Sequence, residues 1–96
     1  MNADYIFQKL HDGLENLESR GFQPQKHRAH FEIPARYKEI VREYFSMFAE
    51  HIYAKSAVVE ISDHFRFQNC DVFWVAGREL ALLWYDDKDI LRREVL

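Results

Sequence analysis

Residues 71–85 have the sequence DVFWVAGRELALLWY, and the predicted sheet is built outward from them. Residues 71–76 and 79–85 are short runs rich in aromatic and branched side chains, a composition typical of β-strands. Between them, the turn 76–79 has Gly77 at its first central position, as a type II′ turn requires. The segment therefore predicts a tight antiparallel hairpin.

Such a hairpin would have apolar side chains on both faces. The predicted turn aligns Trp74 with Ala81 and Phe73 with Leu82, and alternate residues of a strand point to opposite faces. One face would consist of Val72, Trp74, Ala81, Leu83 and Tyr85, and the other of Phe73, Val75, Leu80, Leu82 and Trp84. An antiparallel sheet with one side in water alternates apolar and polar residues. The second apolar face therefore predicts a surface that another protein covers.

The large side chains of this hairpin are the expected partner-binding residues. One face should form the core and the other the interface, and the pattern leaves both assignments open. The residues concerned are Phe73, Val75, Leu82, Trp84, Trp74 and Tyr85.

Two helices are predicted upstream of the hairpin. Residues 3–20 carry an apolar stripe at helical spacing, with Asn2 or Asp4 as N-cap and Gly21 at the left-handed position that ends a helix. Apolar residues of the second helix, 35–54, cover roughly 220° of its circumference at ~100° per residue. A surface helix needs only ~100°, so this helix is expected to be packed on two sides.

Alternation of apolar and polar residues predicts the remaining strands. Residues 27–33 form one short strand, which Pro34 ends while starting the next helix. A second strand runs from residue 57 to residue 68. Residues 86–96 favour a short helix, with a returning edge strand as the alternative.

The predicted order is α-β-α-β-β-β, with a possible short C-terminal helix. Two main helices packed on a small antiparallel sheet form a two-layer α+β domain over residues 1–96. The length of 96 residues has room for one such domain. The aromatic content of 16% suits both a small core and a protein interface.

Cysteine content and hydropathy predict a cytoplasmic protein. The single Cys70 cannot form an internal disulfide, which suits a reducing compartment. The N-terminus has no apolar signal region, and no apolar run approaches ~18 residues. We therefore expect no membrane span.

No motif for catalysis, nucleotide binding or metal binding is found in the sequence. Glycine-rich phosphate loops, paired cysteines and HExxH helices are all missing. The individual candidates are His27 with His30, His51, Asp63 with His64, Cys70, and the carboxylates Asp86, Asp87 and Asp89. Each has a structural interpretation: solvated strand histidines for His27 and His30, a buried helix histidine for His51, a bulge that returns Asp63 to solvent, a spare thiol for Cys70, and a solvated helix start for the three aspartates. We expect no catalytic residue, no cofactor and no metal.

A basic segment offers the main alternative function. It includes Arg20, Lys26, Arg28 and Arg36, with no acidic residue between Glu18 and Glu32. Such a patch predicts contact with phosphates or an acidic protein surface. The net charge of -3, however, is not that of a general nucleic-acid binder.

The two-sided hairpin and the missing motifs predict a non-enzymatic protein-binding module. It would be an inhibitor or adaptor that occludes a partner's surface, and we expect a homodimer. Small size, acidity, high aromatic content and a lack of motifs are typical of small inhibitors encoded by phages or mobile elements and of small bacterial adaptors. The alternative is a nucleic-acid-associated protein using the basic patch between Arg20 and Arg42. A small hydrolase using Asp63, His64 or His51 is the third hypothesis.

Overall fold

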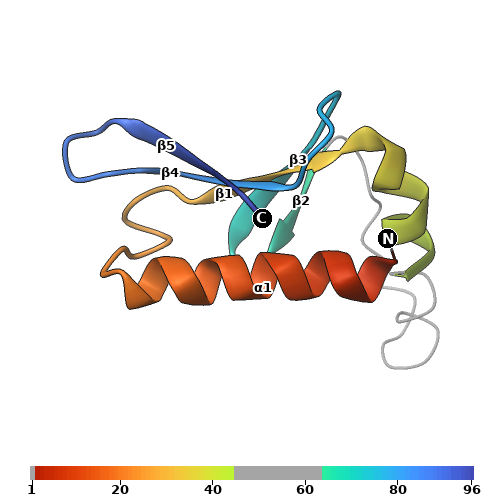
Figure 1. The fold of residues 1–96 in the computed structure, drawn as a ribbon, viewed down its shortest axis with the longest axis horizontal. Coiled ribbons are helices and arrows are strands. Elements are labelled where there is room, and N and C mark those ends of the chain that lie inside the picture. Colours follow the sequence, from red (N-terminus) through yellow and green to blue (C-terminus); the bar gives the residue numbers. More distant parts are fainter. Residues whose placement is uncertain (1, 45–63) are drawn as a thin grey trace.

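A five-stranded sheet with helices on one face makes up the described residues, 2–44 and 64–96, of the computed structural model (Figure 1). The elements are α1 (Ala3–Ser19), β1 (His30–Pro34), the 3-10 turn η1 (Ala35–Tyr37), β2 (His64–Phe67), β3 (Cys70–Val75), β4 (Ala81–Tyr85) and β5 (Leu91–Val95). Residues 38–44 continue η1 as a helix. The α+β class and the predicted order of helices and strands are confirmed. The rest of the second predicted helix and the start of the strand 57–68 lie outside the described residues.

The predicted ends of α1 are confirmed. The Asn2 side chain accepts a hydrogen bond from the backbone N–H of Tyr5 at 2.8 Å, which satisfies one of the free N–H groups at a helix start. Gly21 has a φ of +90°, a left-handed conformation that costs glycine little. The apolar stripe between these ends is buried: Ile6, Leu10, Leu14 and Leu17.

The predicted hairpin 71–85 is wrong, because β1 lies between its two strands. The sheet order is β2-β3-β1-β4-β5, with β1 parallel to β3 and antiparallel to β4. The sheet is therefore mixed rather than antiparallel. A two-residue turn at Gly77 would join only adjacent strands, whereas this connection must cross two strand spacings, about 10 Å. With a strand on each edge, the backbone N–H and C=O groups of β1 all find hydrogen-bond partners. This gain favours the observed sheet over the local hairpin that the turn at Gly77 predicted.

The sheet order also changes which side chains share a face. Phe31 of β1 lies opposite Val72 on one side and Leu82 on the other, so all three share a face. The predicted hairpin had placed Val72 and Leu82 on opposite faces. Compared with the predicted hairpin, β4 is shifted by one residue relative to β3. A shift of one residue moves every side chain of a strand to the other face of the sheet. As a result, Trp74 and Trp84 lie on the same side of the sheet, not on opposite sides.

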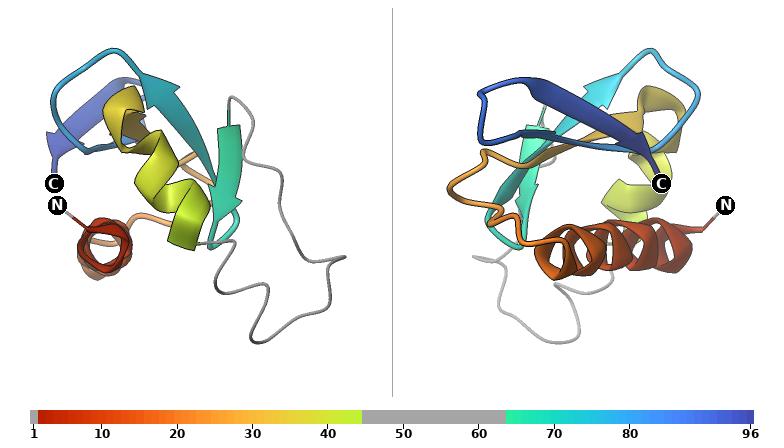
Figure 2. Two further views of the ribbon diagram at one scale, coloured as in Figure 1. Left: turned by 90° about the vertical axis from the view of Figure 1, so that its right-hand side faces the viewer. Right: turned by 60° about the vertical axis from the view of Figure 1, so that its left-hand side comes forward.

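Both helical segments pack on that side and enclose the core (Figure 2). Val41, from helical residues 38–44, is fully buried in the same cluster as Phe31 and Leu82. The ring of Tyr44 lies 5.2 Å from that of Phe7 on α1, so the two helices also touch each other. The expected two-layer packing is confirmed.

The C-terminal segment is a strand, so the favoured helix is wrong and the edge-strand alternative is correct. Asp86 does accept backbone N–H groups, from Lys88 at 2.9 Å and Ile90 at 3.0 Å, but in a turn rather than at a helix start. Asp89 completes the reversal with a φ of +61°. The chain then returns along β4 as β5, and Leu96 donates a backbone hydrogen bond to Leu80 at 2.9 Å.

Truncating Trp84 should strongly destabilise the fold. Its side chain is 5% exposed and packs in the core, so Trp84→Ala should lower the free energy of unfolding by about 3–5 kcal/mol. The control is Tyr5→Ala, since Tyr5 is 48% exposed on α1. Urea denaturation followed by circular dichroism measures both. Equal, small losses in the two variants would contradict the assignment of Trp84 to the core.

Candidate functional site

The face of the sheet opposite the helices is the candidate functional surface, called here the open face. Among residues 2–44 and 64–96, no helix or strand covers it (Figures 1 and 2). Phe73 is 40% exposed there, and Leu91 and Val95 of β5 are 48% and 49% exposed. By the strand registers, its described members are His30, Glu32, Pro34, Arg66, Asp71, Phe73, Val75, Ala81, Leu83, Tyr85, Leu91, Arg93 and Val95.

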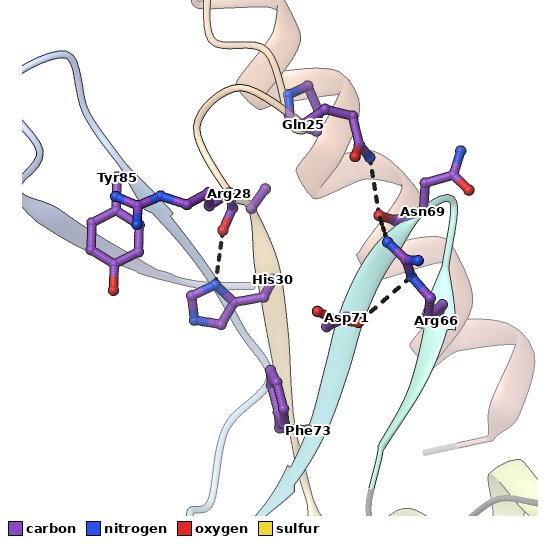
Figure 3. Close-up of a pocket in the computed structure, with 10 residues that line it drawn as sticks. Gln25, Arg28, His30, Arg66, Asn69, Asp71, Phe73 and Tyr85 are labelled. Carbon is purple, nitrogen blue, oxygen red and sulfur yellow. Dashed lines mark hydrogen bonds and ion pairs between the residues drawn. The ribbon is translucent and has the colours of Figure 1, made fainter.

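A hollow of about 500 Å³ lies at one end of the open face (Figure 3). It is formed where β1 and β3 begin and β4 ends, together with the loop before β1 and the turn between β2 and β3. The lining residues are Pro24, Gln25, Arg28, Ala29, His30, Arg66, Asn69, Asp71, Phe73 and Tyr85. The hollow therefore combines three aromatic rings with two guanidinium groups and a carboxylate.

Arg28 forms one wall of the hollow. Its guanidinium group stacks on the ring of Tyr85, 3.9 Å from the ring centre, and pairs with the carboxylate of Asp89. Its φ of +53° is unusual for a residue with a side chain and costs about 1 kcal/mol or more. Backbone hydrogen bonds on either side, from Tyr85 to His27 and from Ala29 to Pro24, hold this conformation. The contacts with Tyr85 and Asp89 orient the guanidinium group.

The opposite wall is held by the turn between β2 and β3. Gln68 and Asn69 both have positive φ angles, 48° and 66°, as in the type I′ turn of a two-residue hairpin. The carbonyl oxygen of Asn69 accepts hydrogen bonds from the Gln25 and Arg66 side chains, both at 3.0 Å. Arg66 also lies 3.6 Å from the carboxylate of Asp71. This hairpin was not predicted from the sequence.

His30 lies between the two walls. Its Nδ1 is 3.0 Å from the carbonyl oxygen of Arg28, so Nδ1 carries the proton and donates it to that oxygen. The ring meets Phe73 edge-on, with the ring centres 6.0 Å apart. None of the described residues that line the hollow is a serine, threonine or cysteine. This arrangement suits recognition of a surface with mixed apolar and charged groups.

The predicted partner-binding residues are divided between the two faces. Phe73, Val75 and Tyr85 lie on the open face, whereas Trp74, Leu82 and Trp84 pack under the helices. The basic residues are also dispersed. Arg28 lines the hollow, while Arg36 lies beyond the far end of β1 and donates to the Arg78 carbonyl at 2.7 Å. Arg20 pairs with Glu94 at 2.7 Å, and Lys26 is exposed in the loop before β1.

The histidine predictions need one correction. His27 was interpreted as a solvated strand residue, but it lies before β1 and is 6% exposed. Its Nε2 donates a hydrogen bond to the carboxylate of Asp87 at 2.9 Å, and its Nδ1 lies 2.9 Å from the backbone nitrogen and 3.1 Å from the carbonyl oxygen of Gln23. His51 and Asp63 lie outside the described residues, and of His64 only the backbone is described, in β2.

The three aspartates of the last turn do not converge. Asp86 bonds to its own turn and to Arg92, Asp87 to His27, and Asp89 to Arg28. Within residues 2–44 and 64–96, no group of three or more histidine, cysteine or acidic residues is suited to hold a metal ion. No helix in the described part of the chain is long and apolar enough to cross a membrane.

No protein family, no curated protein and no solved structure matches the chain.

Asp86 should make stability depend on acid pH. The N–H of Ile90 and the side chain of Arg92 stabilise its charged form and lower its pKa below the usual value. A lowered pKa adds stability above the pKa of the unfolded chain, and this stability is lost as pH falls through the folded pKa. Asp86→Asn should therefore be less stable than the wild type at pH 7, and the difference should shrink below about pH 4. Melting temperatures across pH 2–8 measure this; a gap that grows in acid would contradict it.

Cys70 should not react with thiol reagents in the folded protein. The side chain is 1% exposed, and burial raises the pKa of its thiol, so little reactive thiolate forms at neutral pH. We expect Cys70 to react with Ellman's reagent only after urea unfolding. A Phe73→Cys variant, with its new thiol on the open face, is the positive control. Rapid native labelling at Cys70 would revive a thiol-based mechanism.

Proposed function

We propose that this protein is a non-enzymatic protein-binding module, an inhibitor or adaptor whose open face occludes a partner's surface. The observation that carries the proposal is Phe73, a large aromatic residue 40% exposed on β3, an inner strand of the sheet. Exposed aromatic residues near the centre of a surface are typical anchors of protein interfaces. A cytoplasmic location, expected from the lone cysteine, is part of the proposal.

The surroundings of Phe73 support a protein partner. Val75 and Tyr85 extend the apolar surface, while His30 and Asp71 supply polar groups beside it. An apolar centre with a polar, hydrated rim is the usual anatomy of a protein interface. The hollow next to Phe73 gives a partner's side chain a place to insert.

The charges of the open face favour a protein over a nucleic acid. Each arginine on or beside this face is near a carboxylate: Arg28 near Asp89, Arg66 near Asp71, and Arg93 near Glu32. A nucleic-acid site needs unpaired positive charge to replace the counterions of the phosphates. Paired charges instead offer both signs, which gives specificity towards a protein surface.

A photo-crosslinking experiment tests this function. A photoreactive phenylalanine at position 73, in cells of the native host, should crosslink one defined protein. The same group at position 5, an exposed site on α1, should not. With the captured protein purified, Phe73→Ala should weaken binding by about 30-fold or more, as expected for an interface anchor.

The matched control is Tyr5→Ala, which removes an aromatic residue of similar exposure, 48% against 40% for Phe73, from the helical side. Its affinity for the captured protein, measured by calorimetry, should equal that of the wild type. Equal crosslinking from positions 73 and 5, or full affinity in Phe73→Ala, would contradict the open face as the binding surface. Salt-sensitive binding of duplex DNA by the wild type would favour the nucleic-acid alternative.

A further inference from the structure

The free backbone edge of β5 can make a second kind of contact, although the side chains of Leu91, Arg93 and Val95 belong to the open face. β5 is the last strand of the sheet order, and only β4 pairs with it within the described residues. Two hydrogen bonds fix the orientation of its backbone: Leu96 donates to Leu80 at 2.9 Å, and Asp86 donates to Ile90 at 3.0 Å. Because antiparallel pairs alternate, the even-numbered residues of β5 bond to β4. The N–H and C=O groups of Leu91, Arg93 and Val95 therefore point outward.

We propose that this edge pairs antiparallel with β5 of a second copy of the chain, with the two-fold axis at Arg93. The sequence Leu-Arg-Arg-Glu-Val of residues 91–95 is self-complementary in this register. Leu91 lies opposite Val95 of the second copy, and Arg92 lies opposite its Glu94. Opposite charges and apolar pairs facing each other both stabilise a sheet.

On the helical side of the sheet, charged side chains of the two copies would form a continuous row across the proposed junction. Arg92 already pairs with Asp86 at 2.8 Å, and Glu94 pairs with Arg20 at 2.7 Å. With Arg92 opposite Glu94 of the second copy, the row runs Asp86, Arg92, then Glu94 and Arg20 of the second copy. The sign of the charge alternates along it. The row occurs twice, because the pairing is symmetric.

The axis brings Arg93 opposite its own copy, which is the one unfavourable pair. Glu32 lies 3.5 Å from Arg93 and offsets this repulsion in each chain. Moving the register by two residues in either direction would place Arg92 opposite Arg92, or Glu94 opposite Glu94. Both shifts also lose an apolar pair. The charges therefore select one register as well as one partner.

Exposed apolar side chains support the same pairing. Leu91 and Val95 are about half exposed, an unusual pair for the edge of a monomeric sheet. The junction would cover both with the matching residues of the second copy. This inference uses the edge of the sheet and does not rest on partner binding by the open face.

Two charge-reversal variants test the pairing. Arg92→Glu places glutamate opposite glutamate in its homodimer, and Glu94→Arg places arginine opposite arginine. We expect the wild type to be a dimer at micromolar concentration by analytical ultracentrifugation, and each variant to dissociate at least tenfold more readily. An equimolar mixture should form a heterodimer again, since both of its cross-strand pairs are then opposite in charge. Circular dichroism checks that each variant is folded.

A cysteine at the axis tests the register without changing these charge pairs. Directly opposite, hydrogen-bonded residues have Cα atoms about 5.5 Å apart, within disulfide range. Arg93→Cys should therefore form a covalent dimer on mild oxidation, whereas Leu91→Cys alone should not. A monomeric wild type at 100 µM or above, or failure of the charge-reversal mixture to reassociate together with no crosslink at position 93, would overturn the proposal. A dimer that crosslinks through Phe73→Cys instead would assign self-association to the open face.

Discussion

The pairing of β1 on both of its edges is the constraint from which the rest of the fold follows. Phe31 and Ile33, fully buried on β1, lie at the centre of the core. Because β1 occupies the middle of the sheet, β3 and β4 must be separated, and their side chains take the register that β1 imposes. That register places both tryptophans under the helices and leaves Phe73 on the open face. An edge position for β1 would instead expose a row of its backbone groups.

Features set by neighbouring residues could be predicted from the sequence, and features set by distant pairing could not. The caps of α1, its apolar stripe and the alternation in β1 depend on residues within a few positions of each other. The insertion of β1 between β3 and β4 joins β1 to segments about forty and about fifty residues away, and no local signal encodes it. At residues 86–96 the local signal was ambiguous. An aspartate that accepts backbone N–H groups starts a helix or closes a turn by the same chemistry.

The hollow was not foreseen for the same reason. Its walls come from the loop before β1, the turn between β2 and β3, and the end of β4, so only the sheet order brings Arg28, Arg66 and Tyr85 together. One signal was available: Asn69 favours the left-handed conformation that a type I′ turn needs. The basic segment of the sequence included Arg28, and we expected its charge to be available for phosphates or an acidic surface. In the fold, Arg28 instead pairs with Asp89.

The two proposed surfaces are compatible because of the geometry of an antiparallel pair. Directly opposite residues in such a pair lie on the same side of the sheet, so a dimer through β5 would present both open faces on one side. The Leu91 and Val95 side chains would join these faces into one surface with a hollow in each half. A partner with two matching sites would then bind both halves at once, and its second contact would be intramolecular. Dimerisation through β5 would thus raise the apparent affinity of the protein for such a partner, while each open face makes the same contacts as in a monomer.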